Sequence, residues 1–227
     1  MITLYTAVGH LKFEKRQDAQ FPMIQIGPQD YGLAPEELVL WSRLAFQMLT
    51  CQELADAYTD GLHVQGITSG ASFDYFLRRL LNRQLIVTGS GLTGVNALYN
   101  LLSGLYMQPV KDSFVLRLFS CIQLHTSGKL TVFGFQKHLK RPQNTQIEAL
   151  VLKLTKECAF SVAELLSYLE LAETKDIPAK KAKKFFYETG HETCDSLAQQ
   201  VQLNQTQLPV LQAIGNLYLN KQIFFDK

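Results

Sequence analysis

The motif that most directly suggests chemistry is a glycine-rich segment, Gly89-Ser90-Gly91-Leu92-Thr93-Gly94. It follows an expected strand, Leu85 to Val87, and precedes an expected helix that begins at Val95. Glycines in this context let a backbone approach a pyrophosphate at a helix N-terminus, and Asp112 lies near the distance expected for a ribose-binding acid. A nucleotide site is therefore one hypothesis. We favour a glycine-rich turn at the end of a strand, because no series of parallel strands follows.

Residues typical of metal sites and catalysis are sparse. His191 and Cys194 form half of a possible zinc site, but a zinc site needs three or four ligands and no second pair has matching spacing. His125 and His138 are isolated. No Gly-x-Ser-x-Gly elbow or comparable nucleophile occurs. We expect no metal, no cofactor and no catalytic residue, so the protein is not expected to be an enzyme.

Basic side chains provide the main binding hypothesis. An expected helix capped by Ser72 carries Arg78 and Arg79, followed by Arg83, and all three lie off its apolar stripe. Four of five consecutive positions further along are lysine: Lys180, Lys181, Lys183 and Lys184. Lysine and arginine contact phosphates, and arginine also binds guanine edges. The alternative for both groups is a solvated surface without a partner.

The helices that carry these residues belong to a pattern that occurs twice. Glu37, Thr50 and Glu53-Leu54 have the same spacing as Glu148, Ser161 and Glu164-Leu165. Thr50 and Ser161 each begin a capping box, in which the hydroxyl residue and a glutamate three positions later bond each other's backbone N–H groups. The two stretches end in similar hexapeptides: Asn82-Arg83-Gln84-Leu85-Ile86-Val87 and Asn220-Lys221-Gln222-Ile223-Phe224-Phe225. Each stretch predicts helix, capped helix, helix and strand.

Hydrophobic periodicity gives the remaining expected elements. Residues 1–27 predict a β-hairpin, with apolar runs from Ile2 to Phe13 and from Phe21 to Ile26 on either side of a polar segment. In the first half we also expect a helix from Pro35, a short helix from Gln52 to about Tyr58, and a turn through Gly61, Gly66 and Gly70. The further expected helices are 95–105, 113–125, 147–156, 162–171 and 206–220. The further expected strands are 129–135 and 223–225.

This order predicts an α+β, mostly helical protein with two winged-helix-like units. We expect a β-hairpin and the first unit over 1–90, a largely helical connector over 91–145, and the second unit over 146–227. The second unit has an insert near 171–205, where the spacing between its equivalent residues is longer than in the first unit.

Composition indicates a compact chain. Of its 227 residues 47% are hydrophobic and 19% are charged, and the net charge is +2. The cysteines are far apart, and the N-terminus has no export signal, which favours reduced thiols in a cytoplasmic protein: Cys51, Cys121, Cys158 and Cys194. No apolar run approaches the ~20 residues that span a bilayer, so we expect no membrane partner.

Residues 1–90 resemble the PqqD-like domain, a winged-helix-like recognition element of peptide-modifying systems. The resemblance rests on a strand pair followed by this pattern: Leu33, Glu36-Glu37, Trp41, Leu44, Thr50, Glu53-Leu54, Phe76-Leu77, Leu80 and Leu85-Ile86. It implies that a peptide adds as a strand to the edge of the hairpin, against the third helix. The chain departs from the family by carrying a second unit and no fused modifying enzyme.

The same order of elements also resembles bacterial winged-helix transcription regulators. That resemblance implies a non-enzymatic, DNA-binding regulatory protein, expected to be a homodimer, which uses Arg78, Arg79, Arg83 and the 180–184 lysines on phosphates. The alternative is a peptide- or protein-binding module that uses the edge of the N-terminal strands, where Ile24 and Ile26 lie. The third hypothesis is a nucleotide-binding protein that uses the 89–94 loop.

Overall fold

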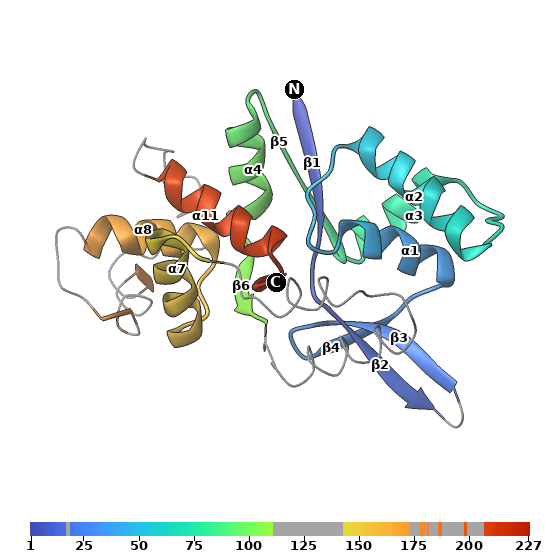
Figure 1. Cartoon of the computed structure of the whole chain (residues 1–227), viewed down its shortest axis with the longest axis horizontal. Helices are drawn as coiled ribbons and strands as arrows, with labels where there is room; N and C mark the ends of the chain where they lie inside the picture. Colours follow the sequence, from blue (N-terminus) through green and yellow to red (C-terminus); the bar gives the residue numbers. More distant parts are fainter. Residues whose placement is uncertain are drawn as a thin grey trace, which may run out of the picture.

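The computed structural model describes residues 1–16, 19–110, 143–172 and 207–227, with a few single positions between 178 and 198. These residues form a mixed α+β protein in which helices lie on both sides of a central pair of strands (Figure 1). None of the helices in these ranges combines the length and the apolar character that crossing a bilayer requires.

The N-terminal strands belong to two different sheets. Strand β1 (Ile2–Ala7) pairs antiparallel with β5 (Ile86–Gly91), from Ile2 opposite Gly91 to Ala7 opposite Ile86. The next three strands form a separate antiparallel sheet in the order β2-β3-β4: β2 (His10–Arg16), β3 (Ala19–Ile26) and β4 (Gln29–Gly32). The prediction that the whole run from Ile2 to Phe13 forms one arm of a hairpin is therefore wrong.

Gly9 is the physical reason for this division. It has φ +83°, a left-handed conformation that glycine adopts without steric cost. A Cβ at this position would lie 2.5 Å from the Gln25 carbonyl oxygen. The chain therefore leaves the first sheet and enters the second at a residue that has no side chain.

Three helices follow the second sheet: α1 (Pro35–Leu44), α2 (Cys51–Gln65) and α3 (Phe73–Asn82). Thr50 and Glu53 cap α2 as predicted, but the helix continues well past Tyr58 and ends at Gly66, which has φ +64°. Gly61 lies inside α2, not in the predicted turn, and a Cβ there would lie 2.6 Å from a methyl carbon of Val39. This glycine permits the close approach of α2 to α1.

The second half of the chain has the same order of helices. Helix α4 (Gly94–Leu102) leads to β6 (Tyr106–Pro109), which pairs antiparallel with the last strand, β7 (Ile223–Asp226). Between these strands lie α7 (Gln146–Glu157), α8 (Val162–Ala172) and α11 (Leu208–Leu219), close to the predicted ranges. The elements predicted over 113–125 and 129–135, and most of the 171–205 insert, lie outside the described residues.

Helices α3 and α11 end in the same backbone arrangement. Gln84 and Lys221 each have φ +59°, and the next residues donate backbone hydrogen bonds five positions back: Leu85 to Leu80 and Gln222 to Leu217. This is a Schellman ending with a left-handed residue after the helix. Gln84 therefore corresponds to Lys221, one position away from the alignment of the two hexapeptides in the sequence.

Two large hydrophobic cores form among the described residues, and β1 ends between them. The first core joins α1, α2, α3 and the start of β5, and the second joins α4, α7, α8, α11 and β7. Ala7 belongs to the first core and Val8 to the second, because successive side chains of an extended chain point to opposite sides. The Gly9 N–H then donates to the Phe225 carbonyl in β7, at 2.8 Å.

Tyr218 of α11 joins the second core to the first. Its hydroxyl oxygen accepts a hydrogen bond from the Phe46 backbone N–H at 3.0 Å and lies 2.9 Å from the Thr6 hydroxyl. Its O–H lies 3.2 Å from the Leu44 carbonyl. Phe46 has φ +60°, which is unfavourable for a residue with a Cβ, so this contact stabilises a strained turn after α1.

Only Leu92 and Thr93 of the glycine-rich segment 89–94 form the predicted turn between strand and helix. Gly89, Ser90 and Gly91 lie in β5, and α4 folds back along that strand. A Cβ on Gly89 would lie 2.2 Å from the Leu101 backbone nitrogen, and one on Gly91 would lie 2.4 Å from that of Ala97. The glycines therefore permit a close strand–helix contact. Asp112 lies outside the described residues.

Replacing Gly89 with alanine should destabilise the protein by ~1–3 kcal/mol or more, because β5 and α4 would have to separate. Gly94→Ala is the matched control, since no atom lies within 4 Å of its Cβ position and alanine is favourable at the start of a helix. Urea unfolding of both variants measures the difference. Equal stabilities would contradict the packing role.

Tyr218 should make the free energy of unfolding depend on alkaline pH. Burial raises the pKa of Tyr218 from 10.0 to about 12, so between these values the unfolded phenol ionises while the folded one stays neutral. The contribution of the neutral Tyr218 phenol to the free energy of unfolding is complete below the pKa of the unfolded chain. It is lost as pH rises through the pKa of the folded protein. The loss should be on the order of 2–3 kcal/mol.

The measurement compares urea unfolding of the native chain and Tyr218→Phe over the range about pH 8 to 12. Burial also raises the pKa of Tyr5 and of Tyr58, but both remain in the variant, so the difference between the two proteins isolates Tyr218. The same alkaline slope in both proteins would show that the Tyr218 phenol does not make this contribution.

Candidate functional site on the third helix

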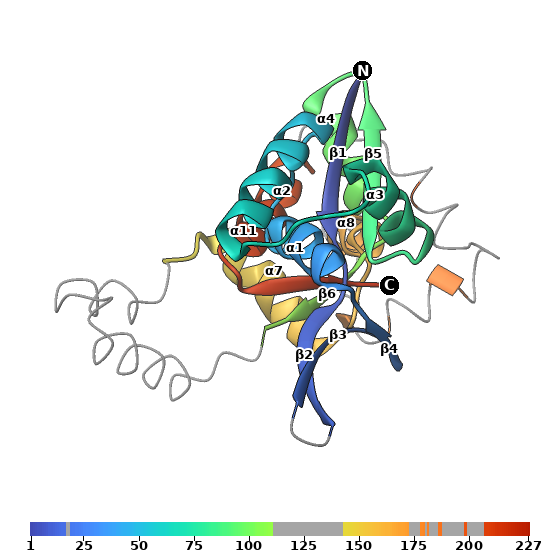
Figure 2. The ribbon, with the colours of Figure 1, turned by 90° about the vertical axis from the view of Figure 1, so that its right-hand side faces the viewer.

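Helix α3 turns one side to solvent. Phe76, Leu77 and Leu80 pack into the first core, and the opposite side is exposed. Figure 2 shows α3 at the face of the molecule that is turned toward the viewer. A hollow of about 610 Å³ follows the exposed side, and its described lining is polar and basic: Ser72, Asp74, Tyr75, Arg78, Arg79, Asn82 and Arg83.

Helix α11 occupies the corresponding place in the second half, but its exposed stripe is narrow and uncharged: Pro209, Gln212, Asn216 and Leu219. Most of its residues from Leu211 to Tyr218 are buried, and Tyr218 contacts residues that precede and follow α1. Of the two third helices, both of which lie in the described residues, α3 presents charged side chains to solvent and α11 presents none. The two halves of the chain cannot bind a partner in the same way.

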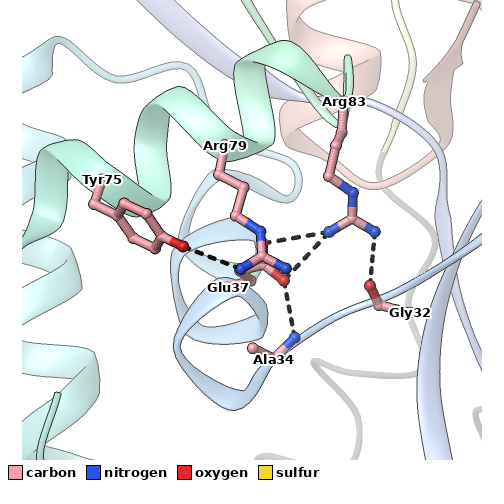
Figure 3. Close-up of polar contacts among 6 residues, drawn as sticks. All are labelled: Gly32, Ala34, Glu37, Tyr75, Arg79 and Arg83. Carbon is pink, nitrogen blue, oxygen red and sulfur yellow. Dashed lines mark hydrogen bonds and ion pairs between the residues drawn. The ribbon is translucent and has the colours of Figure 1, made fainter. Parts of the chain in front are cut away.

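Two arginines of the hollow converge on one buried carboxylate (Figure 3). Arg79 Nε lies 2.9 Å from Glu37 Oε1, and Arg83 Nη1 lies 3.3 Å from Glu37 Oε2. The Glu37 side chain is 1% exposed and also accepts a hydrogen bond from the Ala34 backbone N–H at 2.9 Å. A buried charge is costly unless it is paired and hydrogen-bonded, so the arginines allow Glu37 to remain inside the protein.

Arg83 also connects α3 to the second sheet. Its Nη2 donates to the Gly32 carbonyl in β4 at 2.7 Å, and its guanidinium lies 5.6 Å from the centre of the Tyr31 ring. A cation above an aromatic ring is attracted by the negative face of the ring. Arg79 is less enclosed, with 48% of its side chain exposed, and it donates to the Tyr75 hydroxyl at 3.4 Å.

The second half contains an uncharged counterpart of this contact. Arg79 lies five residues before the left-handed residue Gln84 (84 − 79 = 5). Asn216 lies five residues before the corresponding left-handed residue, Lys221 (221 − 216 = 5). Asn216 donates to Glu148 Oε1 at 3.0 Å, and Glu148, like Glu37, is buried in the first turn of its helix. The Thr145 backbone N–H, which donates to Glu148, lowers the pKa of that carboxyl, while burial opposes the shift.

The predicted phosphate-binding residues thus have different environments. Arg78 is exposed and has no ion-pair partner among the described residues, whereas Arg79 and Arg83 are paired with Glu37. Lys181 is exposed, and its backbone N–H donates to the Pro178 carbonyl. The other three lysines of that run lie outside the described residues: Lys180, Lys183 and Lys184.

Glu37 is the residue whose role the sequence interpretation missed. Its charge near the start of α1 agrees with helix-dipole electrostatics, but its position also lies on the buried side of the helix, with Leu40, Trp41 and Leu44. A carboxylate in an apolar stripe predicts a cationic partner, since acidic residues are almost never fully buried unpaired. That signal identifies Glu37 but not the helix that supplies the partner.

Metal ligands do not cluster in the described ranges, where no three His, Cys, Asp or Glu side chains lie together. Cys51 and Cys158 are free thiols. The other residues considered as ligands lie outside those ranges: His125, His138, His191 and Cys194.

Comparisons with known proteins leave the geometry as the guide to function. No family model, curated protein or solved structure matches the chain. The resemblances to the PqqD-like domain and to winged-helix regulators therefore stay predictions.

Replacing Glu37 with glutamine should cost about 1–3 kcal/mol of stability, because the Ala34 N–H keeps an acceptor but Arg79 and Arg83 lose their charged partner. Glu148→Gln is the matched control and should cost less, since its partners, the Thr145 N–H and the Asn216 amide, are uncharged donors. Urea unfolding at neutral pH measures both. Equal costs would mean that the ion pairs add nothing to the hydrogen bonds.

Proposed function

We propose that this chain is a non-enzymatic DNA-binding protein of winged-helix type that uses the exposed side of α3. The observation that carries the proposal is the outward position of this helix, with arginines along a hollow of about 610 Å³. A helix that protrudes with basic and amide side chains suits the major groove, where arginine contacts phosphates and guanine and asparagine contacts adenine. Asn82 and Arg78 are such residues on this side.

Arg78 is the residue on which we place the main contact. A guanidinium without an intramolecular partner is free to bind a phosphate, whereas one held by a buried carboxylate must break that contact first. Arg79 is half-exposed, but its Nε contacts Glu37 and its Nη1 donates to the Tyr75 hydroxyl, so it is less free than Arg78 to contact a phosphate. We assign Arg83, which is 26% exposed, to holding α3 against β4.

Arg78→Ala should weaken binding to a mixed-sequence duplex and lower the slope of log affinity against log salt by about 1, because one phosphate contact is lost. Fluorescence anisotropy of a labelled duplex between about 50 and 200 mM salt measures both quantities. Arg43→Ala, on α1 and outside the hollow, is the matched control for loss of one positive charge.

The result that would overturn the proposal is either no binding of duplex and single-stranded DNA at about 50 mM salt, or equal losses in the two variants. Arg79→Ala is not a suitable probe, because it also removes a partner of buried Glu37 and thereby changes stability. Unfolding curves of Arg78→Ala and Arg43→Ala establish that both variants are folded before binding is compared.

A second candidate, a peptide-binding module, is favoured by one specific observation. In the described residues β4 pairs only with β3, and Arg83 holds it beside α3. An extended peptide that added to the open side of β4 would gain backbone hydrogen bonds and lie next to the hollow. Ile24 and Ile26 do not mark this edge, because they lie in β3, the central strand, and Ile24 is completely buried.

The two candidates predict different amide shifts in heteronuclear NMR spectra. A duplex should move the signals of Tyr75, Arg78 and Asn82, whereas strand addition should move those of Asp30 and Tyr31 on β4. A charge at Ile24 does not distinguish them, since it would disrupt the first core.

A further inference from the structure

The junction between the two halves contains a cavity that the proposed DNA contact does not use. Its volume is about 800 Å³. The end of β1, the start of β2 and the last turns of α1 form one wall, and β6, β7 and Tyr218 form the other. The described lining is mainly apolar: Ala7, Gly9, His10, Leu11, Trp41, Ser42, Ala45, Phe46, Gln108, Pro109, Val110, Tyr218, Phe224 and Asp226.

Size, position and lining are those of a small-molecule site. Such sites are typically ~300–1,000 Å³ in volume, lie between structural units, and combine aromatic and aliphatic walls with a few polar groups. Here the aromatic surface comes from both halves, with Trp41 and Phe46 on one wall and Phe224 on the other. The His10 and Phe224 rings, one from each half, lie 5.2 Å apart.

Asp226 gives the cavity its charge. Among the described lining residues it is the one carboxylate, no lysine or arginine joins it, and it has no ion-pair partner in the described part of the chain. Its Oδ1 accepts hydrogen bonds from the Gly27 and Lys227 backbone N–H groups, at 3.0 and 2.9 Å. Its Oδ2 has a single contact, 3.3 Å from the Gly27 nitrogen, so lone pairs of the carboxylate remain available.

We propose that this cavity binds a small organic cation, an amine on an aromatic body, with the ring against Trp41, Phe46 and Phe224 and the ammonium group on Asp226. The apolar walls favour a ring, because they offer little to a strongly hydrated molecule. The unpaired carboxylate selects against an anion, because an anionic group beside Asp226 would lose hydration and meet a like charge.

The probes are tryptamine and indole-3-propionate, which share the indole ring and carry opposite charges. We expect the 227-residue chain to bind tryptamine with a Kd below about 1 mM and to bind indole-3-propionate at least roughly 10-fold more weakly, as measured by calorimetry. A rise in the melting temperature with tryptamine is the second readout, since a ligand that binds the folded state stabilises it.

Three variants test the location. Asp226→Asn keeps an oxygen for the Gly27 N–H and should remove most of the preference for the amine over the acid. Ala45→Phe fills the cavity and should abolish binding of tryptamine. If that variant does not fold, Ser42→Phe replaces it, because it also fills the cavity and starts from an exposed position of α1. Asp56→Asn removes an exposed carboxylate of α2 outside the cavity and should leave the Kd unchanged.

The proposal fails if the chain binds neither probe, if it binds both equally, or if the filling variants that fold bind tryptamine as the native chain does. None of these outcomes bears on DNA binding through α3. The two proposals therefore stand or fall separately.

Discussion

The hydroxyl group of Tyr218 is the contact on which the arrangement of the two halves depends. It is buried between the cores, accepts the Phe46 N–H and lies within hydrogen-bond reach of Thr6 and Leu44. Thr6 precedes α1, Leu44 is its last residue and Phe46 follows it, whereas Tyr218 lies near the end of α11. Because the phenol is neutral and fully surrounded, it fixes the position of α11 without the cost of burying a charge. The same contact buries one side of α11, whose exposed stripe carries no charged residue, whereas α3 presents arginines to solvent.

The second constraint is the buried carboxylate of Glu37. It determines which of the three arginines near the end of α3 are structural, because Arg79 and Arg83 must neutralise it, while Arg78 stays free. The equivalent carboxylate, Glu148, has an amide partner in Asn216 and needs no arginine. The same geometry is thus satisfied by an ion pair in one half and by a neutral hydrogen bond in the other, so the position of Asn216 on α11 needs no basic residue.

Local signals in the sequence located most of the described helices. Two kinds of signal depend only on residues a few positions apart: the capping boxes at Thr50 and Ser161, and apolar stripes of period 3.6. They can therefore be recognised in the sequence without knowledge of the fold. The errors occurred at glycines, since Gly9, Gly61 and Gly89 have roles that depend on distant chain segments: Gln25, Val39 and Leu101. The hexapeptide alignment was wrong by one residue for a related reason, because the left-handed residues Gln84 and Lys221 are not chemically alike.

The sequence by itself therefore determined the composition of the site and the order of its elements: arginines on a capped helix that precedes a strand. Only the tertiary structure decided which arginine is free, because that depends on the position of Glu37, more than forty residues earlier in the chain. The tertiary structure also decided that most of α11 is buried and that a cavity lies between the halves. These are properties of how two cores meet, and a local pattern holds no information on that geometry.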